Sequence, residues 1–215
     1  MGRLRTIIQT SSDVITGKTT LIAKFLIAGT ALAVGLTGPQ IPNAKEAPEM
    51  PEIQPLPAIP YEASWKCEDC SPEEQYVLEQ LQEHTKISDR NALATIMGNI
   101  KQESKFIPNI CEGGARVSYR DCTRGGYGLI QWTSIGRYNN LGKFCDKYGC
   151  DPSSLEGQTR YMINENVFQR YLPEFEGRGR TVHQYMVPAY YWLGWGIKGA
   201  RETYSYDYVK KLSWS

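Results

Sequence analysis

The residue whose type and position most clearly indicate a chemical role is Glu103, which continues an apolar stripe to the end of an expected helix. It follows Ile100 by three positions and Ile96 by seven, so the three share one helix face. Partial burial and the negative end of the helix dipole both raise the pKa of a carboxyl group there. A raised pKa suits a general acid, for example one that protonates the leaving oxygen of a glycosidic bond. The alternative is an exposed glutamate at a frayed helix end.

A glycine-rich stretch at residues 124–132 is the second feature that could belong to a functional site. It reads Arg-Gly-Gly-Tyr-Gly-Leu-Ile-Gln-Trp. Glycine allows backbone to approach a ligand closely, and the side chain of Gln131 offers both a donor and an acceptor. Tyr127 and Trp132 are aromatic residues in the same stretch. The same glycines also fit an ordinary tight turn, and both interpretations can hold together.

The elements that position these residues are expected to be mainly helical. Residues 71–74, Ser-Pro-Glu-Glu, combine a capping serine, a proline at the first position and a box-closing glutamate. Apolar periodicity and capping signals predict helices at about 72–84, 88–105, 138–148, 152–162, 182–193 and 198–212. Between residues 106 and 132, glycine and turn chemistry predict a small irregular β insert. The expected fold class is therefore α+β, mainly α-helical.

The C-terminal aromatic residues are dense enough to serve either a core or a sugar groove. Tyr190, Tyr204 and Tyr208 recur at helical spacing, which favours core packing for these three. Neighbouring rings such as Trp195 are open to either role.

Composition narrows the function classes. The chain has 24 basic and 23 acidic residues, a balance that gives no support for nucleic-acid binding. The apolar fraction of 41% suits a single modest core. Only two histidines occur, which limits histidine-based metal or triad chemistry, and no metal or organic cofactor is expected.

The six cysteines fall into three close pairs, Cys67/Cys70, Cys111/Cys122 and Cys145/Cys150. Three local disulfides of an exported domain are the preferred interpretation. A zinc site built from the first and third pairs, or a redox role for the first pair, are the alternatives. A cysteine peptidase would pair a free thiol with His84 or His183, and complete disulfide pairing would leave no thiol.

Two segments precede the expected domain at residues 65–215. Residues 39–64 hold seven of the 12 prolines and predict an extended linker. Residues 1–38 place basic residues before an uncharged stretch of 14 residues, 25–38, which is shorter than the ~20 that a spanning helix needs. Extension back to residue 19 reaches that length. The segment fits a signal peptide cleaved near residues 31–33, a membrane anchor contacting lipid through residues 19–38, or a buried or partner-bound helix.

The Glu103-Ser104 pair that ends a helix, followed by a glycine-aromatic-glycine-leucine-x-glutamine stretch at residues 126–131, resembles the phage tail lysozyme family. That family lies within the broader group of soluble lytic transglycosylases and goose-type lysozymes. Further matches to its pattern are Leu155-Glu156-Gly157-Gln158, Glu165 and Ala200-Arg201. The resemblance covers about residues 75–212 and implies a lysozyme-like fold.

The resemblance also assigns roles to individual residues. It implies that Glu103 is the catalytic acid, that Ser104 supports it by hydrogen bonding within the substrate site, and that Gly128 and Gln131 line the sugar groove. In that groove Gln131 would offer a donor and an acceptor to acetamido groups, and Tyr127 and Trp132 are the candidates for stacking on a sugar ring. An inverting hydrolase would need a second carboxylate, for which Glu112 and Asp121 are the candidates. A lytic transglycosylase needs none, because a hydroxyl of the substrate attacks and leaves an anhydro sugar.

The function that follows is cleavage of the peptidoglycan glycan strand by a phage-encoded enzyme during genome entry or lysis. Such an enzyme would be carried in the virion, in contact with other tail proteins, or exported to the host periplasm. The alternative is a catalytically inactive lysozyme-like module that binds the wall or serves a structural role in the particle.

Overall fold

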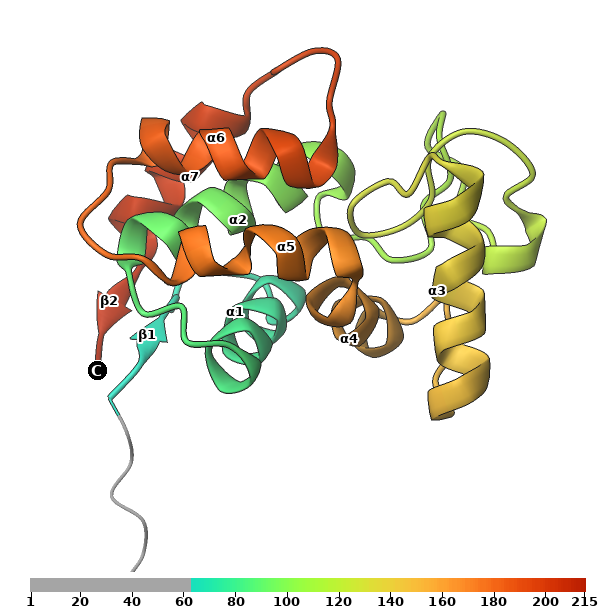
Figure 1. The fold of residues 1–215 in the computed structure, drawn as a ribbon, viewed down its shortest axis with the longest axis horizontal. Helices are drawn as coiled ribbons and strands as arrows, with labels where there is room; N and C mark the ends of the chain where they lie inside the picture. Colours follow the sequence, from blue (N-terminus) through green and yellow to red (C-terminus); the bar gives the residue numbers. More distant parts are fainter. Residues whose placement is uncertain (1–62) are drawn as a thin grey trace, which may run out of the picture. The chain divides into compact units, whose positions relative to one another are not determined.

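A computed structural model describes residues 63–215 of the chain (Figure 1). The predicted hydrophobic segment at residues 1–38, and the linker up to residue 62, lie outside the described residues. The described helices and strands are β1 (Trp65–Lys66), α1 (Pro72–His84), α2 (Arg90–Ser104), α3 (Ile135–Tyr148), α4 (Leu155–Asn164), α5 (Asn166–Glu176), α6 (Val182–Leu193), α7 (Arg201–Lys211) and β2 (Ser213–Trp214). The expectation of a mainly helical fold is confirmed.

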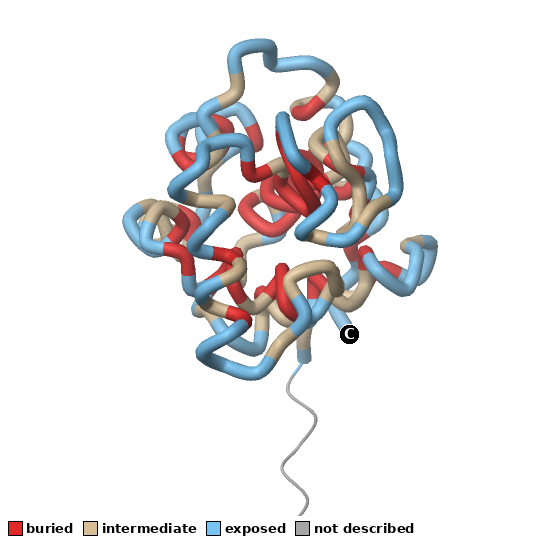
Figure 2. The backbone as a smooth tube through the Cα atoms, turned by 90° about the vertical axis from the view of Figure 1, so that its right-hand side faces the viewer, coloured by how far each residue is buried: buried red, intermediate tan, exposed pale blue. Residues whose placement is uncertain are grey.

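Helix α2 is the central element, and nearly its whole length is buried (Figures 1 and 2). Asp89 caps its start, because the carboxylate accepts hydrogen bonds from the amides of Asn91 and Ala92 at 2.8 and 3.2 Å. Its end is fixed at Lys105, which adopts a left-handed conformation and donates its amide to the Lys101 carbonyl. Glu103 therefore lies in the last turn of a buried helix, as the sequence predicts.

Helix α7 packs directly along α2, and Gly98 permits the close approach. A Cβ atom at residue 98 would lie only 2.5 Å from the backbone nitrogen of Ser205, so no larger residue fits there without moving α7. The amide of Ala200 donates to Gln102 Oε1 at 2.9 Å, which ties the start of α7 to the end of α2. Two segments about a hundred residues apart in sequence are thereby held side by side.

The only β-sheet among residues 63–215 joins the two ends of the described domain. Strands β1 and β2 pair antiparallel, with Trp65 opposite Trp214 and their ring centroids 5.2 Å apart. The sequence patterns did not predict this pairing, since each strand is two residues long. It closes the domain on itself.

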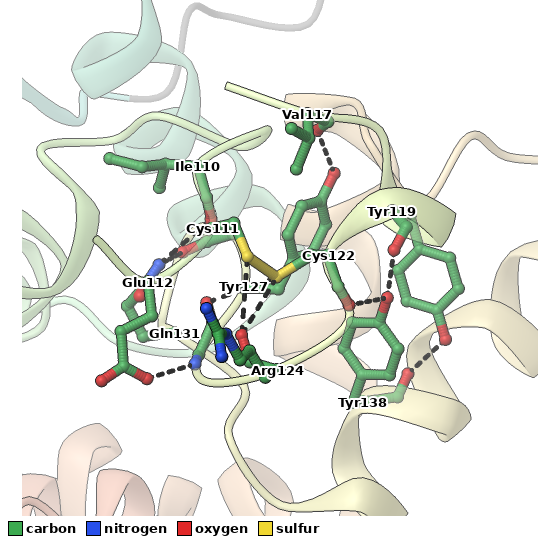
Figure 3. The surroundings of a disulfide bond; sticks show 12 residues. Ile110, Cys111, Glu112, Val117, Tyr119, Cys122, Arg124, Tyr127, Gln131 and Tyr138 are labelled. Carbon is green, nitrogen blue, oxygen red and sulfur yellow. Dashed lines mark hydrogen bonds between the residues drawn. A yellow bond between two sulfur atoms is a disulfide. The ribbon is translucent and has the colours of Figure 1, made fainter. Parts of the chain in front are cut away.

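The insert between α2 and α3 contains isolated bridges in place of a regular sheet. Residue Ile110 bridges Arg116, and Cys111 bridges Tyr127. The Cys111–Cys122 disulfide crosses the insert beside the Tyr127 ring, whose hydroxyl donates to the Val117 carbonyl at 3.2 Å (Figure 3). Covalent and aromatic contacts thus hold a segment with little backbone pairing.

All six cysteines form the three local disulfides that the spacing predicts, namely Cys67–Cys70, Cys111–Cys122 and Cys145–Cys150. Sulfurs bonded in this way are neither thiolate ligands for zinc nor nucleophiles, so the alternatives built on free thiols are not supported.

Helix α5 was not expected from the sequence. It contains Pro173, a residue that normally argues against a helix interior. The helix nevertheless buries Phe168 and Phe175, seven residues apart, whose ring centroids stack at 6.0 Å. Packing of these rings outweighs the local cost. Within residues 63–215, no helix is both long enough and apolar enough to cross a bilayer.

Candidate active-site groove

Glu103 lines a groove with a volume of about 660 Å³. Three segments line it: the end of α2, residues 130–137 that lead into α3, and the α6–α7 loop (residues 194–200) with the adjoining ends of both helices. The lining residues are Glu103, Ile130, Gln131, Thr133, Ser134, Arg137, Leu193, Gly194, Trp195, Gly196, Ile197 and Arg201.

The Glu103 side chain is only 15% exposed, and its two oxygens differ. Oε1 accepts a hydrogen bond from the Arg201 guanidinium, whereas no residue in 63–215 donates one to Oε2. Burial raises the pKa of the Glu103 carboxyl above its ordinary value. The hydrogen bond and charge of Arg201, and the charge of Arg137, act to lower that pKa without cancelling the effect of burial. Glu103 therefore holds a proton at higher pH than an ordinary glutamate.

Arg201 connects the acid to the loop that forms one wall. While one guanidinium nitrogen binds Glu103, Nη1 donates to the carbonyls of Ile197 and Lys198 at 2.9 and 2.8 Å. The guanidinium also lies 4.7 Å from the Trp195 ring centroid. Its buried Nε has no hydrogen-bond partner within the described residues. Arg201 thus fixes the wall of the groove and faces the acid at the same time.

Arg137 faces the same groove from the first turn of α3. Its Nε and Nη2 donate to the two oxygens of Glu165 at 2.6 and 2.7 Å, a bidentate pair. Glu165 is almost fully buried at the junction of α4 and α5. The hydroxyl of Tyr161 lies 3.4 Å from Glu165 Oε1 and 3.1 Å from the Arg137 carbonyl.

Ser104 is not placed to support the acid. Its side chain is buried, and its hydroxyl donates to the Leu129 carbonyl at 2.7 Å, while no bond to Glu103 is present. The expectation that Ser104 assists Glu103 or contacts substrate is therefore corrected. The residue ties the end of α2 to the glycine-rich stretch, because its side chain points into the domain.

Gly128 is also corrected, from a groove residue to a packing residue. It has a φ of 73° and lies against the buried side chain of Gln158, which leaves no room for a Cβ atom. Gln158 Oε1 accepts from the Leu129 amide at 2.7 Å, and its Nε2 donates to the carbonyls of Pro108 and Pro152, both at 2.7 Å. The glycine is required for this close approach, not for the approach of a ligand.

Gln131 lines the groove, as does the neighbouring Ile130, to which the motif assigned no role. Its Nε2 donates to the carbonyls of Gly128 and Ile110 at 3.0 and 3.3 Å, and its backbone has a positive φ of 52° (Figure 3). Contact between Gln131 and a sugar stays a prediction.

Tyr127 and Trp132 are core residues, contrary to the expectation that they stack on sugar. Their exposed fractions are 0% and 1%, and the Trp132 ring packs against Tyr161 with centroids 5.4 Å apart. Their burial is the physical reason for the correction, because a ring must be exposed to stack on a ligand. Trp195 from the C-terminal aromatic group lies in the groove instead, while Tyr190 is 46% exposed and Tyr208 is in the core.

The two candidates for a second carboxylate do not line the groove. Glu112 is exposed, and its Oε2 accepts from the Gly126 amide at 2.9 Å (Figure 3). Asp121 is exposed and accepts from the Ser118 hydroxyl at 2.6 Å. Both carboxylates stabilise turns of the insert.

Sequence reasoning missed Arg137 and the contact of Arg201 with the acid. In the sequence Arg201 is only one of the further matches to the family pattern, and Arg137 belongs to no motif. The glycines that surround Trp195 are the one local hint that the segment before Arg201 forms a loop. Contacts across 98 residues have no signature in a single sequence.

The described residues form a disulfide-bonded, mainly helical domain with one partly buried acid in an open groove, an arrangement that is compatible with a lysozyme-like protein. A model of the phage tail lysozyme family matches residues 73–184, which are 112 of the 215 residues, so the chain belongs to that family. Membership makes it a phage-associated, lysozyme-like protein that acts on peptidoglycan. No curated protein and no solved structure matches the chain. The family match ends before the α6–α7 loop and Arg201.

Proposed function

We propose that the groove binds the glycan strand of peptidoglycan and that Glu103 protonates the leaving oxygen of the scissile glycosidic bond. One observation carries the proposal. Among residues 63–215, Glu103 is the single carboxyl group that lines the groove, burial raises its pKa, and its Oε2 accepts no hydrogen bond. An acid that holds its proton near neutral pH and keeps one oxygen open to the substrate fits this step.

Arg201 assists the transfer of the proton from Glu103 to the leaving oxygen. When Glu103 has given up its proton, the carboxylate that forms is stabilised by the charge and the hydrogen bond of Arg201. The guanidinium stays in place because the carbonyls of Ile197 and Lys198 hold it. Stabilisation of the charge that develops during proton transfer lowers the barrier to that transfer.

A groove lining with one carboxylate supports intramolecular attack over activation of water. Glu112 and Asp121, the sequence candidates for a base, have other partners and lie outside the lining. With no second carboxylate in the groove lining of residues 63–215, a hydroxyl of the muramyl sugar is the available nucleophile: it attacks the anomeric carbon as the glycosidic bond breaks, its proton passes to the Glu103 carboxylate, and the product is an anhydro sugar. In infection this reaction would open the wall during genome entry or lysis.

A second candidate function is a wall-binding module without catalysis. The observation in its favour is the Glu103–Arg201 ion pair itself, since a buried pair of this kind also occurs as a purely structural element. In that case Glu103 would hold the α6–α7 loop against α2 and do no chemistry.

The test incubates the full-length protein with purified peptidoglycan and analyses the released fragments by mass spectrometry. Glu103→Gln keeps the shape and the acceptor for Arg201 but cannot donate a proton, so release is expected to fall roughly 100- to 10,000-fold. The matched control is Glu156→Gln, an exposed glutamate of α4 that is also paired with an arginine.

Each outcome separates the candidates. Loss in Glu103→Gln alone, with anhydro ends in the wild type, supports acid catalysis by transglycosylation, whereas reducing ends would show a hydrolase. Release that persists in Glu103→Gln would rule out this acid. A folded wild type that binds the wall and releases nothing would support the binding module.

A further inference from the structure

The Arg137 guanidinium is held rigidly and still presents free donors to the groove. A guanidinium carries five N–H groups. Glu165 accepts two of them in a bidentate arrangement, one from Nε and one from Nη2. The other three, including both on Nη1, have no partner within residues 63–215. The Arg137 side chain is 22% exposed, in contrast to 4% for Glu165, so the pair has a buried side and an open side.

The local structure fixes the orientation of that open side. Ser134 caps the helix by accepting from the Arg137 amide at 3.3 Å, and the Tyr161 hydroxyl donates to the Arg137 carbonyl. Both ends of the residue are thereby anchored, its backbone by the helix start and its guanidinium by Glu165. Because little side-chain freedom remains to be lost, a ligand that pairs with the open edge does so at a low entropic cost.

The charge of the groove favours an anionic ligand. Its ionisable lining residues are Glu103, Arg137 and Arg201, which gives two permanent cations and one carboxyl group that is neutral in the acid form. The Arg137 charge is felt at the Glu103 carboxyl, where it acts to lower the pKa, so the two groups are near one another in the groove. A carboxylate on the substrate, close to the scissile bond, would complement this arrangement.

We propose that Arg137 determines specificity by binding a carboxylate carried by the muramyl sugar next to the scissile bond. Two carboxylates of peptidoglycan fit this chemistry: the lactyl carboxylate of a peptide-free strand, or the first carboxylate of the stem peptide where the lactyl group is amidated. Either one distinguishes peptidoglycan from a neutral polymer of N-acetylglucosamine. The proposal rests on the proposed glycan-cleaving function and names the substrate group that the same groove recognises.

The experiment measures kcat and KM of the full-length protein on three soluble substrates. These are neutral N-acetylglucosamine oligosaccharides, glycan strands stripped of peptides, and peptide-bearing strands. The wild type is expected to prefer at least one of the two anionic substrates by roughly 10- to 100-fold in kcat/KM, the value of one charge-assisted bidentate contact. Preference for the stripped strands identifies the lactyl carboxylate, and preference for the peptide-bearing strands alone identifies the stem carboxylate.

The test variant changes both partners, Arg137→Gln with Glu165→Gln, so that no buried charge is left unpaired. The ratio of kcat/KM on the anionic substrate to kcat/KM on the neutral one is expected to fall toward one, mainly because KM for the anionic substrate rises. The matched control is Arg160→Gln with Glu156→Gln, which removes another arginine–glutamate pair, on α4 and outside the groove. That control is expected to retain the wild-type preference.

A second measurement works on the substrate and needs no variant. Methyl esterification of the preferred strands should lower the wild-type kcat/KM by the same factor. Equal rates on neutral, esterified and anionic substrates would overturn the role of Arg137 while leaving the glycosidase function intact. If no substrate of any kind is cleaved, the proposed function fails first, and the specificity role fails with it.

Discussion

Two arginine–glutamate pairs each contribute an arginine to the same groove, and the pairs are built differently. In the Glu165–Arg137 pair the carboxylate is the buried member, and both of its oxygens accept hydrogen bonds from the guanidinium. In the Glu103–Arg201 pair the arginine is the more buried member, at 6% exposure against 15%, and only one carboxylate oxygen is bonded.

The difference shows what a carboxyl group needs in order to act as an acid. Both oxygens of Glu165 accept hydrogen bonds from Arg137, and Oε1 also accepts one from Tyr161, so neither oxygen is left unbonded as Glu103 Oε2 is among the described residues. Glu103 is desolvated without being fully compensated, and the pKa of its carboxyl is accordingly raised. The same two residue types thus give a structural pair at one wall and a candidate acid at the other.

The largest expected effect is on stability, from Glu165→Gln. The change leaves the Arg137 charge without its buried counter-ion, which is expected to lower the free energy of unfolding by about 3–5 kcal/mol. Below the raised pKa of Glu103, Glu103→Gln replaces a neutral carboxyl by a neutral amide, and Arg201 keeps the carbonyls of Ile197 and Lys198 as acceptors, so the free energy of unfolding is expected to change by less than about 1 kcal/mol. Urea unfolding of the two variants beside the wild type measures both. Equal losses would contradict the distinction between a structural pair and a candidate acid.

The next prediction disturbs one arginine–glutamate pair and spares the other, because it moves a single helix, α7. Gly98→Ala is expected to push α7 away from α2, since a Cβ at residue 98 meets the backbone of Ser205. Overpacking of this kind costs about 1–3 kcal/mol, and it displaces Arg201 from Glu103 while leaving the Glu165–Arg137 pair untouched. Activity should fall by more than the loss of folded protein explains. The control is Ala94→Gly, one turn earlier on the buried helix; wild-type specific activity in folded Gly98→Ala would refute the coupling.

The sequence predicts the position of the candidate acid better than it predicts the surroundings of that residue. Glu103 stands out because its helix has a clear apolar period, and the three disulfides are predicted because each joins cysteines that are close in the chain. Helix boundaries with capping boxes, at Ser71 and Thr181, were likewise visible. All of these features are set by interactions within about a dozen residues.

The features that the sequence did not reveal depend on distant contacts. Gly128 was expected to face a ligand because nothing local shows that Gln158, thirty residues later, fills the space beside it. Tyr127 and Trp132 were assigned to the groove by adjacency to the motif, whereas the turn directs both rings into the core. The Arg201 contact with Glu103 requires that α7 return along α2, which only the packed structure specifies.

A smaller effect is expected on the pH profile, from Arg201→Met. Arg201 lowers the pKa of Glu103 through its hydrogen bond and its charge, so removal raises that pKa further. The protonated acid then persists to higher pH, and the alkaline limb of the kcat profile moves upward in pH. The position of the limb, not the height of the profile, is the measurement, because the α6–α7 loop also loses its anchor. Arg160→Met serves as the control, and an alkaline limb that moves downward would contradict the assignment of Glu103 as the acid.

The smallest effect tests the raised pKa of Glu103 through stability alone and requires no substrate. A carboxyl with a raised pKa in the folded state binds its proton more tightly when folded than when unfolded. Its favourable contribution is therefore complete below the pKa of the unfolded carboxyl and is lost as the pH rises through the folded pKa. Glu103→Gln lacks this contribution, so the stability of the wild type relative to the variant should decline across that window and then level off. Urea unfolding at successive pH values measures the difference, and an increase with pH would show that Arg201 outweighs burial and that Glu103 forms a structural ion pair like Glu165.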